Sequence, residues 1–186
     1  GCGNGYLIRY LLEKNVGKIS GCDVTQSSVD YVNNAFQESP NFEKCFHIQK
    51  IPSTIPSNYF DIVFFIETIE HLLDHYFEPT IKEIGRVLKP GGYIIVTTPH
   101  AEDLTKSKVI CPDCGAMFHR MQHIRSFNVK TVNDVFSSFK FKSVYCEAVT
   151  FVEKKKTFRN KIKKIFKKYL YPETNPHLIF IGKNQK

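Results

Sequence analysis

The chain has 186 residues, of which 42% are apolar, enough to build the core of one domain. No run reaches the about 18 to 20 apolar residues of a membrane-spanning helix, no signal peptide opens the chain, and the six cysteines lack a secreted disulfide spacing. These features predict a cytoplasmic protein. The formal net charge of +8 lies in the tail, because residues 154–186 hold eleven Lys or Arg and a single acid.

A glycine-rich turn, residues 1–5 (GCGNG), opens the chain, and residues 6–12 follow it with the spacing of an amphipathic helix. Glycines let the backbone approach a ligand closely, and the helix N-terminus behind them offers unpaired N–H groups. Residues 18–23 indicate a strand that ends in Asp23, where a nucleotide-binding βαβ unit places the carboxylate for both ribose hydroxyls. Two simpler interpretations stay open: an ordinary tight turn for the glycines, and a helix N-cap for Asp23.

Residues 26–37 predict a second helix and residues 42–51 a strand. The next strand, residues 60–66, is an almost unbroken apolar run, which is typical of a parallel strand covered on both faces. It ends in a cluster of ionisable side chains, at the edge where open α/β sheets bind ligands: Glu67, Glu70, His71 and Asp74. Residues 78–88 have helical spacing, the sequence KPGG at 89–92 ends that helix, and residues 93–98 predict another buried strand.

Residues 100–127 fit neither a sheet strand nor a core helix, and they contain four side chains that can bind metal: Cys111, Cys114, His119 and His123. The CPDCG sequence has the spacing of a zinc knuckle, and histidines four residues apart would share one face of a helical turn and complete a tetrahedron. The alternative is a lid loop, with free cysteines and with histidines that face substrate or solvent.

Residues 129–139 predict a helix, residues 141–151 a strand, and residues 177–182 the final strand. Residues 153–172 place apolar side chains at three- and four-residue steps and lysines on the other faces, which predicts a basic amphipathic helix. Three roles stay open for it: packing on its own domain, contact with an anionic membrane surface, and contact with nucleic acid. No base-reading or stacking motif accompanies the lysines, which argues against RNA.

The stretches FDIVFFIETIEHL and RVLKPGGYIIVTTP together resemble the middle of the class I S-adenosylmethionine-dependent methyltransferases, in particular bacterial members of the small-molecule and ubiquinone-biosynthesis kind. The resemblance covers most of the chain and implies one domain over residues 1–186. It also implies an α/β fold with a Rossmann-like doubly wound sheet, mostly parallel, with an antiparallel last strand. Because the family places a central strand before the glycine loop, the chain is expected to be truncated there and to lack the first strand.

The resemblance assigns cofactor contacts residue by residue. The resemblance places the glycines on the methionine side of S-adenosylmethionine, Asp23 at the ribose and Glu67 beside the methionine, with Val24 as a further cofactor contact. The position of the family's adenine-binding acid falls on glutamine, whose carbonyl can still accept the hydrogen bond. The expected cofactor-binding residues are therefore Gly1, Gly3, Gly5, Asp23, Val24, Gln49 and Glu67.

In related enzymes the turn at residues 67–71 lies near the transferred methyl group. Histidine is the natural proton acceptor near neutral pH, so His71 is the first candidate for a catalytic base and His123 the second. Two alternatives stay open: Glu70 and His71 as a hydrogen-bonded pair that shapes the loop, and a divalent-metal site like that of small-RNA 2′-O-methyltransferases. The latter would use Glu67, Glu70, His71 and His123.

The function implied by the resemblance is methyl transfer from S-adenosylmethionine to a small-molecule, lipid-linked or glycan acceptor, with oxygen as the acceptor atom. Zinc would be a second bound group if the Cys/His segment holds it. The expected location is cytoplasmic, with peripheral contact to a membrane through the basic helix. The alternatives are an RNA methyltransferase and a non-catalytic methyltransferase-like fragment.

Overall fold

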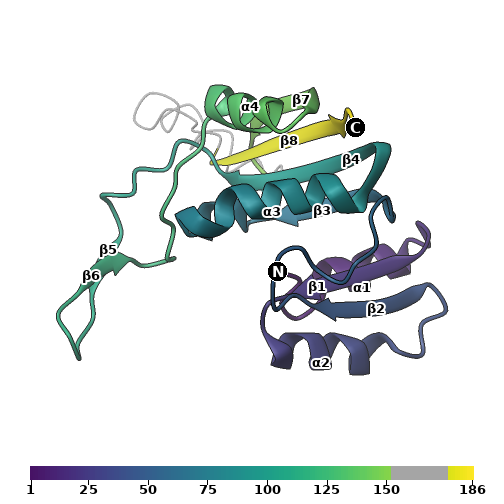
Figure 1. Ribbon diagram of the computed structural model, residues 1–186. Helices are drawn as coiled ribbons and strands as arrows, with labels where there is room; N and C mark the ends of the chain where they lie inside the picture. Colours follow the sequence, from purple (N-terminus) through teal and green to yellow (C-terminus); the bar gives the residue numbers. More distant parts are fainter. Residues whose placement is uncertain (152–175) are drawn as a thin grey trace, which may run out of the picture.

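A computed structural model describes residues 1–151 and 176–186 (Figure 1). The basic helix expected over residues 153–172 lies outside the described residues. The strands of the described chain form a parallel pair β1-β2, a four-stranded sheet in the order β3-β4-β8-β7, and a small hairpin β5-β6. Their bounds are β1 Ile19–Asp23, β2 Phe42–His47, β3 Phe60–Ile66, β4 Leu88–Pro99, β5 Lys108–Ile110, β6 Met117–His119, β7 Phe141–Val149 and β8 His177–Asn184.

The two larger sheets each carry their own helices. Helices α1 (Tyr6–Glu13) and α2 (Gln26–Phe36) pack with β1 and β2 around a small core of Ile8, Val29, Val32, Phe36 and Cys45. Helices α3 (Asp74–Val87) and α4 (Val129–Ser138) lie on one face of the four-stranded sheet (Figure 1) and share its larger core. Strand β3 runs parallel to β4, whereas β8 is antiparallel to both β4 and β7. The mixed α/β class and the antiparallel last strand are confirmed.

Strand β3 differs from the expectation of a strand covered on both faces. Phe65 is buried in the core below α3, but Ile62 and Phe64 on the opposite face are 47% and 39% exposed. Successive side chains of a strand point to opposite faces, and in the described part of the chain helices cover only one of them. The expected strand before Gly1 stays a prediction.

Two boundaries in the middle of the chain also differ from the predicted ones. Helix α3 begins at Asp74, a full turn before the predicted start, and keeps Pro79 within it. Strand β4 begins at Leu88 because Leu88 pairs with Phe60, after which the register shifts before β4 continues along β3. The KPGG sequence therefore forms an irregularity within the strand, with Gly91 at φ 75°.

The connection between the two larger sheets is tied to α3 by a partly buried ion pair. The Glu83 carboxylate accepts hydrogen bonds from the N–H of Ser53 (2.9 Å), from its hydroxyl (2.6 Å) and from Arg86 Nε (2.7 Å). Arg86 Nη2 also donates to the Ile55 carbonyl at 2.7 Å. Burial disfavours the charged form of Glu83, but these donors outweigh it and lower the pKa of the carboxyl to about 2.

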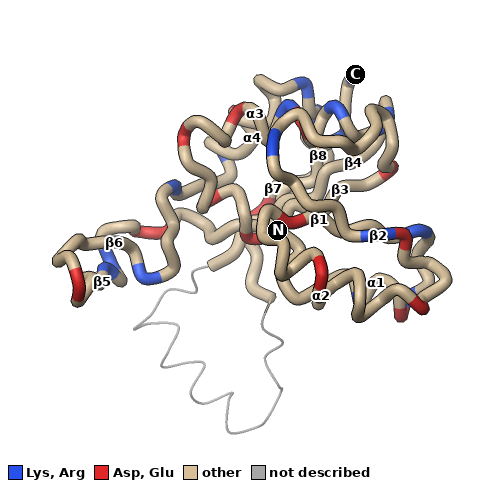
Figure 2. Tube along the Cα trace, turned by 60° about the horizontal axis from the view of Figure 1, so that its bottom comes forward, with Lys and Arg blue, Asp and Glu red and all other residues tan. Residues whose placement is uncertain are grey.

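The charged residues of the described chain are dispersed. Figure 2 shows both Lys or Arg and Asp or Glu in several parts of the described chain, including the β5-β6 hairpin. Within residues 1–151 and 176–186, no helix has both the length and the apolar character needed to cross a bilayer.

Candidate functional site

Asp23, at the carboxyl end of β1, organises the glycine loop. Its Oδ2 accepts a hydrogen bond from Gly3 N–H and its Oδ1 one from Thr25 N–H, both at 2.9 Å. Burial disfavours the charged carboxylate, but the two N–H donors outweigh it and hold the pKa of Asp23 below its usual value. Helix α2 takes Thr25 as its N-cap, so the N-cap interpretation of Asp23 is wrong.

The glycine loop has the open backbone that a ligand needs. Gly3 lies at φ 50°, and a Cβ added there would meet no atom within 4 Å. Gly5, at φ 72°, is the N-cap of α1, and an added Cβ would lie 2.7 Å from the ring of Phe36. At the other end of the loop, a Cβ added to Gly1 would lie 3.4 Å from the Thr68 hydroxyl, which places the loop beside the ionisable turn after β3.

The residues assigned to the ribose and the adenine lie at adjacent strand ends. His47, the last residue of β2, contacts the Val24 carbonyl through Nε2 at 3.1 Å and the Gln49 amide through Nδ1 at 3.3 Å. The Ile48 N–H donates to the Asp23 carbonyl at 2.8 Å. The structure therefore brings Val24 and Gln49 to the same edge as Asp23, and it adds His47, which the sequence pattern did not single out.

The ionisable turn follows β3 at the same carboxyl edge. Glu67 lies at φ 43°, and its N–H donates to the Thr97 carbonyl of β4 at 2.9 Å. Glu70 is only 1% exposed, and its Oε2 accepts a hydrogen bond from the Thr98 hydroxyl at 3.0 Å. Its other oxygen, Oε1, has no hydrogen-bond partner among the described residues, and burial raises the pKa of this carboxyl.

His71 is the exposed member of this turn, with 39% of its side chain accessible. Its Nδ1 contacts the Gln122 carbonyl at 3.3 Å, whereas its Nε2 lies 3.9 Å from Glu70, beyond hydrogen-bond distance. The structure thus does not form the Glu70–His71 hydrogen-bonded pair considered from the sequence. Because a carbonyl can only accept, Nδ1 carries the hydrogen, and neutral His71 keeps Nε2 free to accept a proton.

The predicted zinc residues are divided between the two ends of the β5-β6 hairpin. Cys111 and Cys114 lie in the tight turn at its tip, where Gly115 N–H donates to the Cys111 carbonyl at 2.9 Å. Backbone N–H groups of Cys114 and Asp113 lower the pKa of the Cys111 thiol. His119 lies three residues beyond the Ala116 carbonyl that accepts from Cys111 N–H, a rise of about 10 Å along a strand.

Two groups of three possible metal ligands occur in the described chain, and neither contains a cysteine. In each group the ligand atoms lie within 4.8 Å of one another: Glu70, His71 and His123 in one, and Glu102, His119 and His123 in the other. The first group brings together three of the four residues of the divalent-metal alternative, without Glu67. The second contains Glu102, which the sequence pattern missed.

His123, the second candidate for a base, is engaged in a hydrogen bond with Glu102. Its Nδ1 lies 2.5 Å from Glu102 Oε2, and 9% of its side chain is exposed. Its ring lies edge-on to that of His71, with centroids 4.8 Å apart. His71 is therefore the better placed of the two to meet an acceptor.

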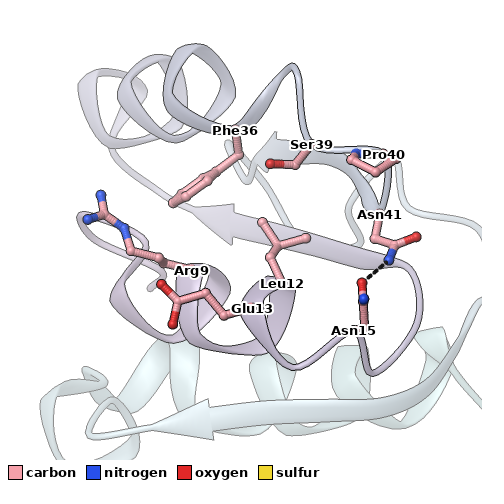
Figure 3. A pocket seen from close by; sticks show the side chains of 8 residues that line it. All are labelled: Arg9, Leu12, Glu13, Asn15, Phe36, Ser39, Pro40 and Asn41. Carbon is pink, nitrogen blue, oxygen red and sulfur yellow. Dashed lines mark hydrogen bonds between the residues drawn. The ribbon is translucent and has the colours of Figure 1, made fainter.

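A separate pocket of about 290 Å³ lies away from this edge (Figure 3). It is lined by the C-terminal part of α1 and by residues before β2, and the Asn41 amide donates to Asn15 across it at 2.9 Å. Ligands of open α/β sheets bind at the carboxyl ends of the strands, whereas this pocket lies at their amino ends. It is therefore distinct from the candidate cofactor site.

Comparison with known families and structures agrees with this geometry. The sequence model of the family described as methyltransferase domain matches residues 1–96, more than half of the chain, and the chain therefore belongs to that family. The class that the sequence predicted, the S-adenosylmethionine-dependent methyltransferases, is confirmed. No curated protein matches the chain.

Three solved structures illustrate the similarity in fold. A chain from the Haloferax volcanii complex of a methyltransferase activator with a methyltransferase has a TM-score of 0.70 at 16% identity, covering 100% of this chain and 80% of its own. An S-adenosylmethionine-dependent methyltransferase of Methanosarcina mazei has a TM-score of 0.66 at 16% identity, with coverages of 99% and 89%. The 1,6-didemethyltoxoflavin-N1-methyltransferase of Burkholderia thailandensis, with substrate and S-adenosylhomocysteine bound, has a TM-score of 0.63 at 12% identity, with coverages of 100% and 69%.

Proposed function

We propose that this domain transfers a methyl group from S-adenosylmethionine to an oxygen of a small-molecule acceptor, including a lipid-linked or glycan precursor, and that His71 accepts the proton of that oxygen. The observation that carries the proposal is the exposed His71 ring, held by its contact with the Gln122 carbonyl at the carboxyl edge. Nε2 is thereby free for an acceptor hydroxyl.

The residues at the strand ends suit the cofactor. The open space at Gly3 leaves room for close approach, and the Asp23 carboxylate, ionised at neutral pH, has lone pairs left for two ribose hydroxyls. Val24 and Gln49 would border the ribose and the adenine, and Gly1, Gly5 and Glu67 the methionine side. When bound, S-adenosylmethionine supplies an electrophilic methyl group on a sulfonium sulfur.

Positioning of the acceptor and removal of its proton are the tasks of the protein's own residues. Methyl transfer needs the acceptor oxygen in line with the reacting carbon, so positioning supplies much of the rate, and removal of the hydroxyl proton supplies about 10²- to 10⁴-fold more. His71 Nε2 performs the second task, while the Gln122 carbonyl fixes the ring. A small acceptor is favoured over RNA because no base-reading or stacking motif accompanies the lysines in the sequence.

The test measures S-adenosylhomocysteine release with a panel of phenols, sugar nucleotides and polyprenyl-linked sugars. With an acceptor found, His71→Asn should lower kcat at least about 100-fold and leave cofactor affinity unchanged. The matched control is His75→Asn, an exposed histidine one turn later, which should change neither. An unchanged kcat in folded His71→Asn protein would remove His71 as the base.

A further inference from the structure

Glu102, His119 and His123 form a cluster that the methyl-transfer proposal does not use. Glu102 follows β4, His119 ends β6, and His123 lies four residues further on. We propose that these three side chains bind one divalent transition-metal ion, and that zinc is the ion that fits the ligand set. The proposal does not depend on the identity of the methyl acceptor.

The backbone brings the three residues together by turns and not by a helix. Ala101, at φ 49°, bends the chain after β4, and its N–H donates to the Phe127 carbonyl at 2.7 Å. Gln122, at φ 59°, closes a turn with the His119 carbonyl, again at 2.7 Å. The rings of His119 and His123 consequently stack with centroids 5.0 Å apart, so the helical turn expected for this histidine pair is wrong.

One buried nitrogen of this cluster has no hydrogen-bond partner within the described chain. The His119 side chain is 5% exposed, and its Nε2 has no hydrogen-bond partner within the described chain. This nitrogen points towards Glu102, with Oε1 at 3.7 Å, just beyond hydrogen-bond distance. Buried polar atoms almost always have partners, and a metal cation is one partner that an imidazole nitrogen and a nearby carboxylate can share.

The separations are close to those that a zinc ion requires. Ligand atoms at 2.0–2.1 Å from zinc in a tetrahedron lie about 3.3 Å apart. The observed separations are 2.5 Å between His123 Nδ1 and Glu102 Oε2 and 3.7 Å between His119 Nε2 and Glu102 Oε1. All three ligand atoms lie within 4.8 Å of one another, so shifts of at most about 1.5 Å in any separation bring them to the zinc geometry. His119 gives up the long 3.4 Å contact of its Nδ1 with the His123 N–H.

The chemistry of the ligands selects the class of ion. Two imidazoles and one carboxylate suit zinc and its transition-metal neighbours, whereas magnesium and calcium prefer oxygen ligands alone. Three protein ligands leave a fourth position open, as in catalytic zinc sites. The ion would hold the segment after β4 next to His71, whose ring lies 4.8 Å from that of His123.

The experiment titrates zinc chloride into chelator-treated protein by calorimetry and measures metal content after dialysis. We expect about one ion per chain, and at least tenfold weaker binding in both Glu102→Gln and His119→Asn. The double variant Cys111→Ser with Cys114→Ser should keep the affinity of the wild type. Cobalt substitution supplies a readout on the unmodified protein: d–d bands should appear without a thiolate charge-transfer band.

Several results would overturn the proposal. These are a failure of the wild type to bind zinc, loss of the ion in the cysteine double variant, or a thiolate band in the cobalt spectrum. Loss of the ion in His71→Asn would instead assign it to the group with Glu70. Circular dichroism checks that each variant folds, and if one does not, the other ligand variant and the cobalt spectrum decide.

Discussion

Replacement of Asp23 tests the proposed cofactor site most directly. In the structure each carboxylate oxygen accepts one backbone hydrogen bond, from Gly3 and from Thr25, and therefore keeps one further lone pair. Two ribose hydroxyls would use these lone pairs, and hydrogen bonds to a charged group contribute about 1.5–3 kcal/mol each before the hydroxyls regain water. Asp23→Ala should therefore weaken binding by about 1.5–3 kcal/mol, or about 10- to 150-fold in Kd.

The assay is calorimetric titration of S-adenosylhomocysteine. Asp30→Ala is the matched control, because Asp30 is an exposed carboxylate of α2 whose hydrogen-bond donor within the described residues is Gln26. Asp23→Asn keeps one acceptor oxygen and should fall between the wild type and the alanine variant. A change of Kd below about threefold in folded Asp23→Ala protein would refute the ribose assignment.

Three other predictions follow from contacts already described. Because the pKa of Glu83 is lowered to about 2, its ion pair stabilises the fold above the unfolded-state pKa, and this contribution is lost as the pH falls towards 2. Glu83→Gln should therefore lower the free energy of unfolding by up to about 3 kcal/mol at pH 7 and by little at pH 2. Urea titrations at the two pH values would measure the difference. Gly5→Ala should lower the Tm more than Gly3→Ala, because only the first meets a ring at 2.7 Å; equal shifts would contradict the packing at Gly5. A hydrogen bond from a neighbouring thiol lowers the pKa of Cys2 to about 7, whereas burial raises that of Cys22, so iodoacetamide at pH 7.5 should label Cys2 before Cys22 in a peptide-mapping time course.

Most elements could be predicted because their signals are local. The apolar run of β3, the glycine turn before α1 and the strand that ends in Asp23 each depend on neighbouring residues alone, and the structure places them as expected. The start of β4 could not be predicted in this way. Leu88 belongs to the strand because it pairs with Phe60, a partner 28 positions away, and the KPGG sequence hid this pairing by indicating a turn.

The proposed metal ligands were still harder to predict from local patterns. The CPDCG spacing is a strong local pattern, so it drew the prediction of zinc to the cysteines. The partner that the structure gives to His119 and His123 is Glu102, which has no motif of its own and comes close only because the chain turns at Ala101 and at Gln122. Their i, i+4 spacing suggested a helix, but the left-handed backbone at Gln122 turns the chain there.

The pairing of β7 with β8 has a practical consequence for the basic segment. Val149 lies opposite His177, and His177 also lies opposite Pro99 at the end of β4. The strands on either side of residues 152–175, a segment with nine Lys or Arg, are thus adjacent and antiparallel, and β8 begins at the edge that carries the candidate site. A hairpin loop of about two to five residues can therefore replace residues 152–175 and join β7 to β8 without disturbing the pairing of these two strands. Flotation with anionic vesicles, compared between this shortened chain and the full one, would measure what the nine charges add.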